Sequence, residues 1–186
     1  LDAATRATVR RELRDHLAGF DGARVMITHD PVDAYALADR VAIVEGGRIV
    51  QTGTVREITA HPRSRYVADL VGVNLLTGTV HQSTMTVANG ASVAVADAPQ
   101  GDVYATIHPH SVTISTDPPA AVSARNVWPA RISNIELLGE RVRLELDGAV
   151  PLVAEITDAS RRSLGLAPGQ QVSASVKATD IAVYSR

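Results

Sequence analysis

His29 is the first residue of this sequence whose type and position could do chemistry. It follows an apolar stretch, Arg24–Thr28, that indicates a short buried strand, and the next helix starts at Pro31 with Asp30 as its N-cap. Ligands of open parallel sheets bind beyond the carboxyl ends of the strands. An imidazole at that edge can donate a hydrogen bond to a phosphate oxygen. The alternative is a histidine that only caps a strand-to-helix turn.

Lys177 is the second candidate, because it is the only lysine of the chain and the other fixed cations are arginines. An ammonium group is a compact point charge, which suits the binding of a small anion. The alternative is a single solvated lysine on a loop. In a faint internal repeat, residues 105–114 align with residues 174–183, and His108 takes the place of Lys177. Because Pro109 removes an N–H donor after His108, we expect no equivalent anion site there.

The composition narrows the possible classes of protein. The 186 residues suffice for two small domains, and with 45% hydrophobic but 3% aromatic residues their cores must consist of Ala, Val, Ile and Leu. The absence of cysteine excludes disulfides, thiol catalysis and cysteine-ligated metals, and we predict no metal site. The net charge of −2 gives no reason to expect nucleic acid as a partner. No apolar run reaches the roughly 18 residues of a membrane span, so we expect a soluble, cytosolic protein.

Residues 1–71 alternate helical and strand patterns. We expect a helix over Ala3–Ala18, capped by Asp2 and ended by Gly19. Its charged residues indicate a solvated face, formed by Arg10, Arg11, Glu12, Arg14 and Asp15. The remaining expected elements are a helix, a hairpin around two glycines and two closing helices, over Pro31–Ala38, Val41–Glu45 with Arg48–Gln51, Thr54–Ala60 and Ser64–Val71.

Residues 72–186 show a different pattern, in which Val and Thr alternate with polar residues between glycine-containing turns. This pattern is typical of small β-barrels. A single helix is expected, over Ala159–Leu164. The alternating pattern and the internal repeat together predict two tandem β modules, residues 72–121 and 122–186.

The order of motifs in residues 1–71 resembles the end of an ABC-transporter ATPase domain. The motifs are Leu1-Asp2-Ala3, Thr28-His29-Asp30, Ala38-Asp39-Arg40-Val41 and the hairpin at Gly46-Gly47. The resemblance implies that Leu1 and Asp2 form the D-loop at the nucleotide-bound dimer interface. It also implies that His29 is the switch histidine, which contacts the γ-phosphate of ATP in the complete enzyme.

The same resemblance shows which motifs the 186 residues lack. No G-x-x-x-x-G-K-[ST] phosphate loop occurs, and the family's signature motif and Walker B strand are absent as well. In the family these motifs, which bind ATP and Mg²⁺, precede the position of Leu1. We therefore expect the C-terminal part of an ATPase subunit that does not hydrolyse ATP by itself.

The second half of the chain resembles molybdate-binding modules of the Mop type. The resemblance rests on Val122–Val127 with Arg131–Gly139 at the start, and on Leu164–Val172 with Ser175–Ile181 at the end. It implies that oxyanions are held at a subunit interface by Ser123, Arg125 and Lys177, with Ala178 and Thr179 as further candidates. The implied fold class is an α/β remnant of an ABC ATPase domain followed by an all-β region of small OB-like barrels of the Mop or TOBE type.

Together, the two resemblances imply the ATP-binding subunit of a molybdate or tungstate importer, on the cytoplasmic face of the cell membrane. The implied partners are a second copy of the chain, membrane permease subunits and a periplasmic-type binding protein. One alternative is the ATPase subunit of a sulfate, polyamine, iron or sugar importer. The other is an oxyanion storage or sensor module without a role in transport, and a protein of that kind has no use for the His29 segment.

Overall fold

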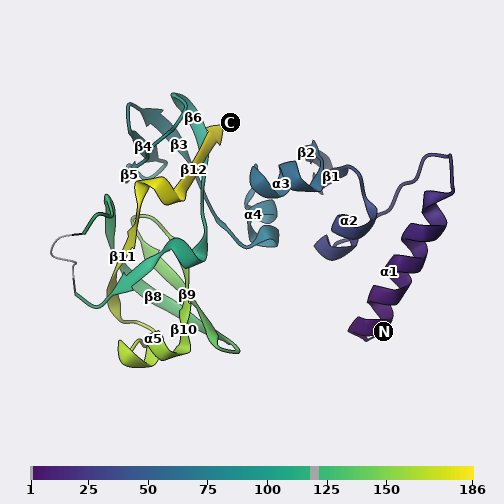
Figure 1. The fold of residues 1–186 in the computed structure, drawn as a ribbon. Coiled ribbons are helices and arrows are strands. Elements are labelled where there is room, and N and C mark those ends of the chain that lie inside the picture. The colour runs from purple at the N-terminus through teal and green to yellow at the C-terminus, as the bar shows by residue number, and fades with distance from the viewer. Residues whose placement is uncertain (1, 118–121) are drawn as a thin grey trace. The chain divides into compact units, whose positions relative to one another are not determined.

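The computed structural model describes residues 2–117 and 122–186, and the chain divides into two compact units, Leu1–Leu70 and Val71–Arg186 (Figure 1). The first unit contains four helices and one hairpin, whereas the second is nearly all β. The predicted fold class, a mixed N-terminal region before an all-β region, is confirmed. None of the helices in the described ranges is long and apolar enough to cross a membrane.

The first two helices of the N-terminal unit begin at the side chains that the sequence indicated. Helix α1 covers Ala3–Ala18, and the Asp2 carboxylate accepts a hydrogen bond from the Thr5 amide at 2.9 Å. Helix α2 covers Pro31–Leu37, and Asp30 accepts from the Val32 amide at 2.8 Å. Each carboxylate satisfies an amide that has no partner within its helix, so local capping sets both helix starts.

A hairpin and two short helices complete this unit. Strands β1 (Val41–Glu45) and β2 (Arg48–Gly53) are antiparallel. Gly46 and Gly47 connect them with φ angles of 55° and 76°, which side-chain-bearing residues rarely adopt. Helix α3 (Val55–Ala60) starts with a capping box between Thr54 and Glu57, and helix α4 covers Arg65–Val71.

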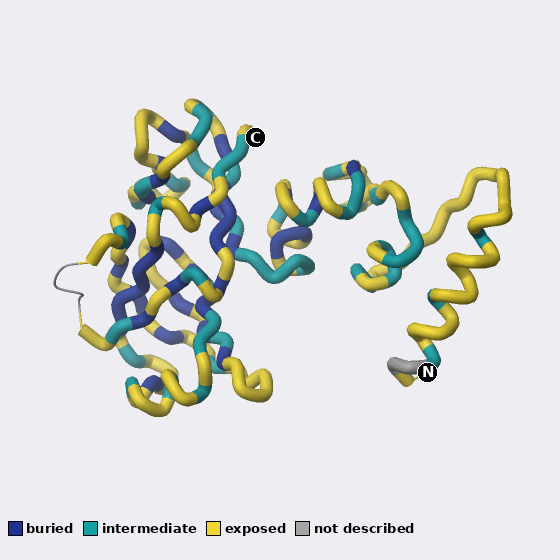
Figure 2. Tube along the Cα trace, in the orientation of Figure 1, coloured by how far each residue is buried: buried dark blue, intermediate teal, exposed yellow. Residues whose placement is uncertain are grey.

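The predicted buried strand over Arg24–Thr28 is wrong. The segment is neither helix nor strand, and the side chains of Val25 and Ile27 are 91% and 98% exposed. Figure 2 shows a continuous exposed stretch between α1 and α2. A strand exists only where its backbone pairs with a neighbour, and no described residue forms a backbone hydrogen bond with this segment. The apolar pattern is present, but its pairing partner is not.

The C-terminal unit consists of two five-stranded antiparallel sheets. The first has the order β12-β6-β3-β4-β5, with strands Ile181–Ser185, Gly101–Ile107, Asn74–His81, Thr84–Val87 and Ser92–Ala94. The second has the order β10-β9-β8-β11-β7, with strands Leu152–Thr157, Arg141–Gly148, Asn126–Leu138, Gln171–Val176 and Thr113–Ser115. The remaining elements are α5 (Asp158–Ser163) and two single 3₁₀ turns, η1 (Pro109–Ser111) and η2 (Ala178–Asp180).

The two sheets have the same strand order and exchange their last strands. Strand β7 follows β6 in the chain but pairs with β11 in the second sheet, and β12 follows β11 but pairs with β6 in the first. The registers are reciprocal, because Ala105 lies opposite Val183 and Ala174 lies opposite Ile114. These four residues are the matching positions of the repeat found in the sequence. The two predicted modules therefore form one unit, in which each sheet contains a strand of the other module.

One apolar core runs through this unit, and its members come from both sheets, from Leu76 to Ile181. Two buried asparagines connect the modules within it. The Asn74 side chain accepts from the Val153 amide at 2.6 Å and donates to the Val153 carbonyl at 2.9 Å. Asn126 makes the equivalent pair of bonds with Ala94, at 2.7 and 2.9 Å. Each asparagine begins the first strand of its module and bonds to the other module, so the exchange is matched by buried polar contacts.

Candidate functional site

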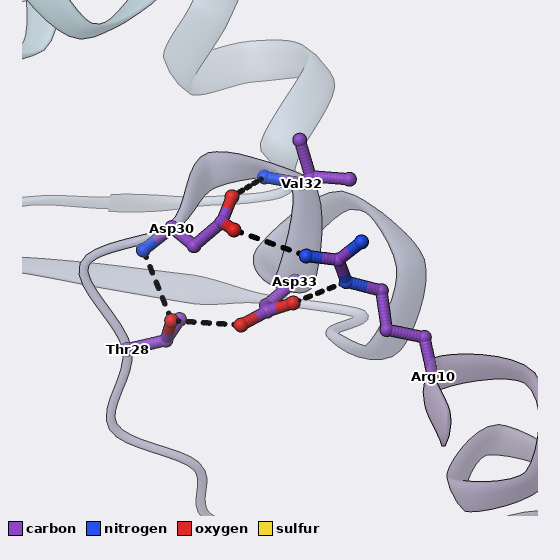
Figure 3. A network of polar contacts seen from close by, with 5 residues as sticks. All are labelled: Arg10, Thr28, Asp30, Val32 and Asp33. Atoms are coloured by element: carbon purple, nitrogen blue, oxygen red, sulfur yellow. Dashed lines mark hydrogen bonds and ion pairs between the residues drawn. The ribbon is translucent and has the colours of Figure 1, made fainter. Parts of the chain in front are cut away.

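His29 is exposed in the structure. The residues before and after it in the chain, Thr28 and Asp30, both make hydrogen bonds (Figure 3). The Asp30 amide donates to the Thr28 hydroxyl at 3.0 Å, and that hydroxyl donates to Asp33 at 3.2 Å. The imidazole itself has no hydrogen bond or ion pair among the residues that the structure describes. The backbone at His29 is therefore anchored while its ring is available to a ligand.

Arg10 connects helix α1 to this segment, and the expectation that it belongs to a solvated face is wrong. Its guanidinium donates through Nη2 to Asp30 at 3.0 Å and through Nε to Asp33, and 19% of its side chain is exposed (Figure 3). These contacts raise the pKa of Arg10 and lower the pKa of Asp33, because each hydrogen bond favours the charged forms. The role of Arg10 could not be predicted from the sequence, because its partners are 20 and 23 residues away and no local pattern marks the contact.

The predicted interface residues at the start of the chain have different outcomes. Leu1 lies outside the described residues. Asp2 is exposed, and its carboxylate accepts from both the amide and the hydroxyl of Thr5, at 2.9 and 2.8 Å. Asp2 therefore fixes the start of α1, and a role at a nucleotide-bound interface stays a prediction.

The predicted oxyanion residues lie on two adjacent segments, which we call the anion rim: Ser123, Arg125, Lys177, Ala178 and Thr179. Strands β8 and β11 are antiparallel neighbours, and Asn126 lies opposite Val176. Arg125 directly precedes Asn126 and Lys177 directly follows Val176, so the two residues flank this last pair of the ladder. Both side chains are exposed, and neither has an ion pair among the described residues. Two cations that are 52 positions apart in the chain thus lie next to the same end of the β8–β11 ladder.

The 3₁₀ turn η2 forms the lysine side of the anion rim. Lys177 precedes the turn, and its carbonyl accepts from the Asp180 amide at 3.0 Å. Thr179 is exposed and its hydroxyl donates to Asp180 at 3.4 Å, whereas Ala178 is half-buried. The rim therefore offers an ammonium, a guanidinium and the Ser123 hydroxyl, with one carboxylate beside them.

The equivalent position in the other module has different chemistry. Asn74 lies opposite Ile107 in the first sheet, as Asn126 lies opposite Val176 in the second. Val73 and His108 therefore take the places of Arg125 and Lys177. His108 stacks on His110 with ring centroids 5.1 Å apart. The sequence predicts that the first module has no equivalent anion site. The different residues at these positions are consistent with that expectation, which stays a prediction.

Comparisons with known proteins agree with the resemblances that the sequence showed in both halves of the chain. A model of the TOBE domain matches residues 122–183. The molybdenum import ATP-binding protein ModC of Mycobacterium tuberculosis is 35% identical over 99% of this chain and 52% of its own length. The molybdate/tungstate import ATP-binding protein WtpC of Pyrococcus horikoshii is 37% identical over 99% of this chain and 53% of its own. A sulfate/thiosulfate import ATP-binding protein, CysA 2 of Chromobacterium violaceum, is 32% identical over 99% and 51%.

The chain spans about half the length of these curated relatives. Among solved structures, the cytoplasmic molybdate-binding protein ModG matches 61% of this chain and 96% of its own, with a TM-score of 0.55 and 21% identity. At that identity the match shows a shared fold. The resemblances inferred from the sequence are therefore confirmed. The TOBE match covers nearly the same residues as the segment that resembles a Mop-type module.

Proposed function

The chain carries a TOBE domain and is related along its length to the ATP-binding subunits of ABC importers, and we propose that it belongs to such a subunit in a molybdate or tungstate importer. Two of the relatives described above are molybdate or tungstate importer subunits. In the proposed assembly, two copies bind ATP between them and act on membrane permease subunits from the cytoplasmic side. A periplasmic-type binding protein delivers the oxyanion on the other side.

In this proposal, His29 donates a hydrogen bond to the γ-phosphate of ATP in the complete enzyme. The support is its exposed ring on an anchored backbone and its place in the Thr28-His29-Asp30 motif. The 186 residues contain no G-x-x-x-x-G-K-[ST]. Among the described residues, no group of three His, Asp or Glu side chains is arranged to hold a metal ion. The proposal therefore assigns the binding of ATP and Mg²⁺ to the complete enzyme, and the chain alone is expected to be inactive.

The anion rim is the proposed regulatory site, and a molybdate or tungstate dianion is its proposed ligand. The observation that carries this assignment is that Arg125 and Lys177 flank the last residue pair of the β8–β11 ladder, and that neither has an ion pair among the described residues. Like charges at the same end of a β ladder repel, and a dianion bound between them offsets that repulsion. The Ser123 hydroxyl adds a donor, and the backbone amides of Ala178 and Thr179 are further candidates.

A sulfate importer is the second candidate, because a sulfate/thiosulfate import protein is nearly as similar to this chain. Sulfate is also a tetrahedral dianion, so the same donors suit it. The two candidates share the proposed site and differ in the anion that is bound more tightly.

Calorimetric titration with sodium molybdate tests the proposed site. We expect saturable binding to the wild-type chain and at least about tenfold weaker binding to Lys177→Ala, because a hydrogen bond to a charged group contributes about 1.5–3 kcal/mol. Arg162→Ala is the matched control, since Arg162 is a cation of the same unit that pairs with Asp158 on α5. Unchanged affinity in Lys177→Ala would remove the anion rim from the proposal.

A further inference from the structure

Arg10 is the point at which two separate stretches of the first unit meet. It lies in the middle of α1, whose start is fixed by Asp2, and its guanidinium contacts Asp30 and Asp33 beside His29 (Figure 3). The two carboxylates have different neighbours. Asp30 caps α2 through the Val32 amide, and Asp33 accepts from the Thr28 hydroxyl. Arg10 therefore contacts Asp30, which follows His29, directly, and it is connected to Thr28, which precedes His29, through Asp33.

We propose that Arg10 is a positioning residue for His29, and that through α1 it links the placement of His29 to the Asp2 end of the same helix. This inference rests on the proposed function, because the proposed function supplies the ligand of His29, the γ-phosphate of ATP. Arg10 does not touch that ligand. It fixes the backbone from Thr28 to Asp33, so that the exposed imidazole starts from one position.

The geometry of the guanidinium explains why an arginine is needed here. Nε and Nη2 donate to two carboxylates, that of the N-cap and that of the first turn of α2, which a planar fork can do at the same time. An ammonium group on a flexible stem can neutralise both charges but does not impose a plane. The network is also partly shielded, with Asp30 and Asp33 29% and 30% exposed. Arg14 offers a contrast, because it contacts Asp15 at 3.9 Å with both side chains mostly exposed.

The link to Asp2 follows from the helix itself. Arg10 lies eight residue steps after Asp2, which is about 12 Å along a helix at 1.5 Å per residue. Both ends of this stretch are fixed, since Asp2 caps the helix and Arg10 holds the His29 segment. A shift of α1 at Asp2 is therefore transmitted to Asp30 and Asp33 as a movement of a rigid element.

Amide hydrogen exchange and backbone relaxation of the ¹⁵N-labelled 186-residue chain test the proposal. In Arg10→Ala we expect the amides of Asp30 and Val32 to exchange at least tenfold faster, and the ¹H–¹⁵N NOE of His29 to fall to values typical of flexible backbone. The Arg6 amide, bonded to the Asp2 carbonyl at 3.1 Å, is expected to keep its exchange rate. Arg14→Ala is the matched control on the same helix and is expected to leave all four probes unchanged.

Two results would overturn the proposal. One is wild-type exchange and NOE values at Asp30, Val32 and His29 in Arg10→Ala. The other is an equal change in Arg14→Ala. If Arg10→Ala melts both helices, Arg10→Lys decides. If Arg10→Lys keeps both helices but leaves His29 mobile, the guanidinium fork positions His29. If His29 stays rigid in Arg10→Lys, or if the helices melt there too, Arg10 acts in folding alone. None of these readouts involves an oxyanion, so failure here is distinguishable from failure of the anion rim.

Discussion

The two units of this chain are stabilised in different ways. Val71–Arg186 has a continuous apolar core to which both sheets contribute, and Asn74 and Asn126 tie its modules together. In Leu1–Leu70, the described buried apolar side chains are few and lie toward its C-terminal end, among them Ile58 and Val67. Helix α1 has no buried residue among those whose burial is described (Figure 2). The local order of Leu1–Leu70 comes from helix caps, the glycine turn of its hairpin and the Arg10 network.

This difference shows what local signals can and cannot do. Caps, turns and ion pairs define where helices begin and how two helices meet, but a cap contributes about 0.5–2 kcal/mol and an exposed ion pair about 1 kcal/mol or less. A shared core makes every strand depend on the others, because each fully buried aliphatic side chain contributes about 1.5–3 kcal/mol. The first unit is therefore expected to respond locally to substitution and the second cooperatively.

The largest expected contrast comes from truncating a leucine in each unit. Leu144 is fully buried in the second unit, so Leu144→Ala is expected to lower its free energy of unfolding by about 2–5 kcal/mol. Leu13 on α1 is 39% exposed, and Leu13→Ala is expected to change stability by less than about 0.5 kcal/mol. Urea unfolding followed by the fluorescence of buried Trp128 measures the first change, and helical circular dichroism the second. Equal losses would contradict the comparison.

The asparagine contacts test whether the exchanged modules act as one unit. Asn126→Ala leaves the amide and carbonyl of Ala94 without their side-chain partner, which is expected to cost about 1–3 kcal/mol. Trp128 fluorescence during urea unfolding measures the loss. Asn134→Ala is the control, because Asn134 is exposed. A loss in Asn126→Ala no greater than in the control would show that the buried contacts do not couple the modules.

Matched helix caps give a smaller contrast. Thr54 caps α3 within a capping box, whereas Thr157 caps α5 through the Ser160 amide at 3.1 Å. Each Thr→Ala change is expected to cost about 0.5–2 kcal/mol of local stability. Thr54→Ala should lie at the upper end, because it also removes the hydroxyl that donates to Glu57, and the lowered pKa of Glu57 rises in part while the backbone amide of residue 54 still donates to it. Amide exchange in the two helices measures both effects, and a larger loss in Thr157→Ala would refute the ranking.

The smallest expected effect is the acid response of the Arg10 network. The hydrogen bond from Arg10 to Asp33 lowers the pKa of Asp33 below the usual value of 3.8. The stability that this gives is present above the unfolded pKa and is lost as the pH falls through the folded pKa. We therefore expect the contact between α1 and α2 to loosen only below about pH 4. Carboxyl ¹³C titration should show the Asp33 midpoint rising toward 3.8 in Arg10→Ala, and identical midpoints would contradict the assignment.

Elements set by local chemistry could be predicted from the sequence. Helix α1 has the predicted bounds and caps, and the hairpin turns at Gly46-Gly47 as expected. The anion rim residues could be named from the sequence as well. Their juxtaposition required the β8–β11 register, which pairs residues about 50 positions apart.

Features that depend on distant partners could not be predicted. Arg24–Thr28 has the composition of a buried strand, but composition does not reveal whether a neighbouring strand is present to pair with it. The repeat indicated two modules, yet only the pairing of β7 with β11 and of β12 with β6 shows the exchange. Arg10 looked like part of a solvated face because nothing in its neighbourhood marks a contact 20 residues away.

The most direct test of the proposed function is a competition between molybdate and sulfate for the wild-type 186-residue chain, measured by titration calorimetry. We predict saturable molybdate binding that a tenfold excess of sulfate does not displace. Sulfate binding as tight as molybdate binding would contradict the assignment to a molybdate or tungstate importer in favour of sulfate. The absence of binding by either anion would contradict the anion rim itself.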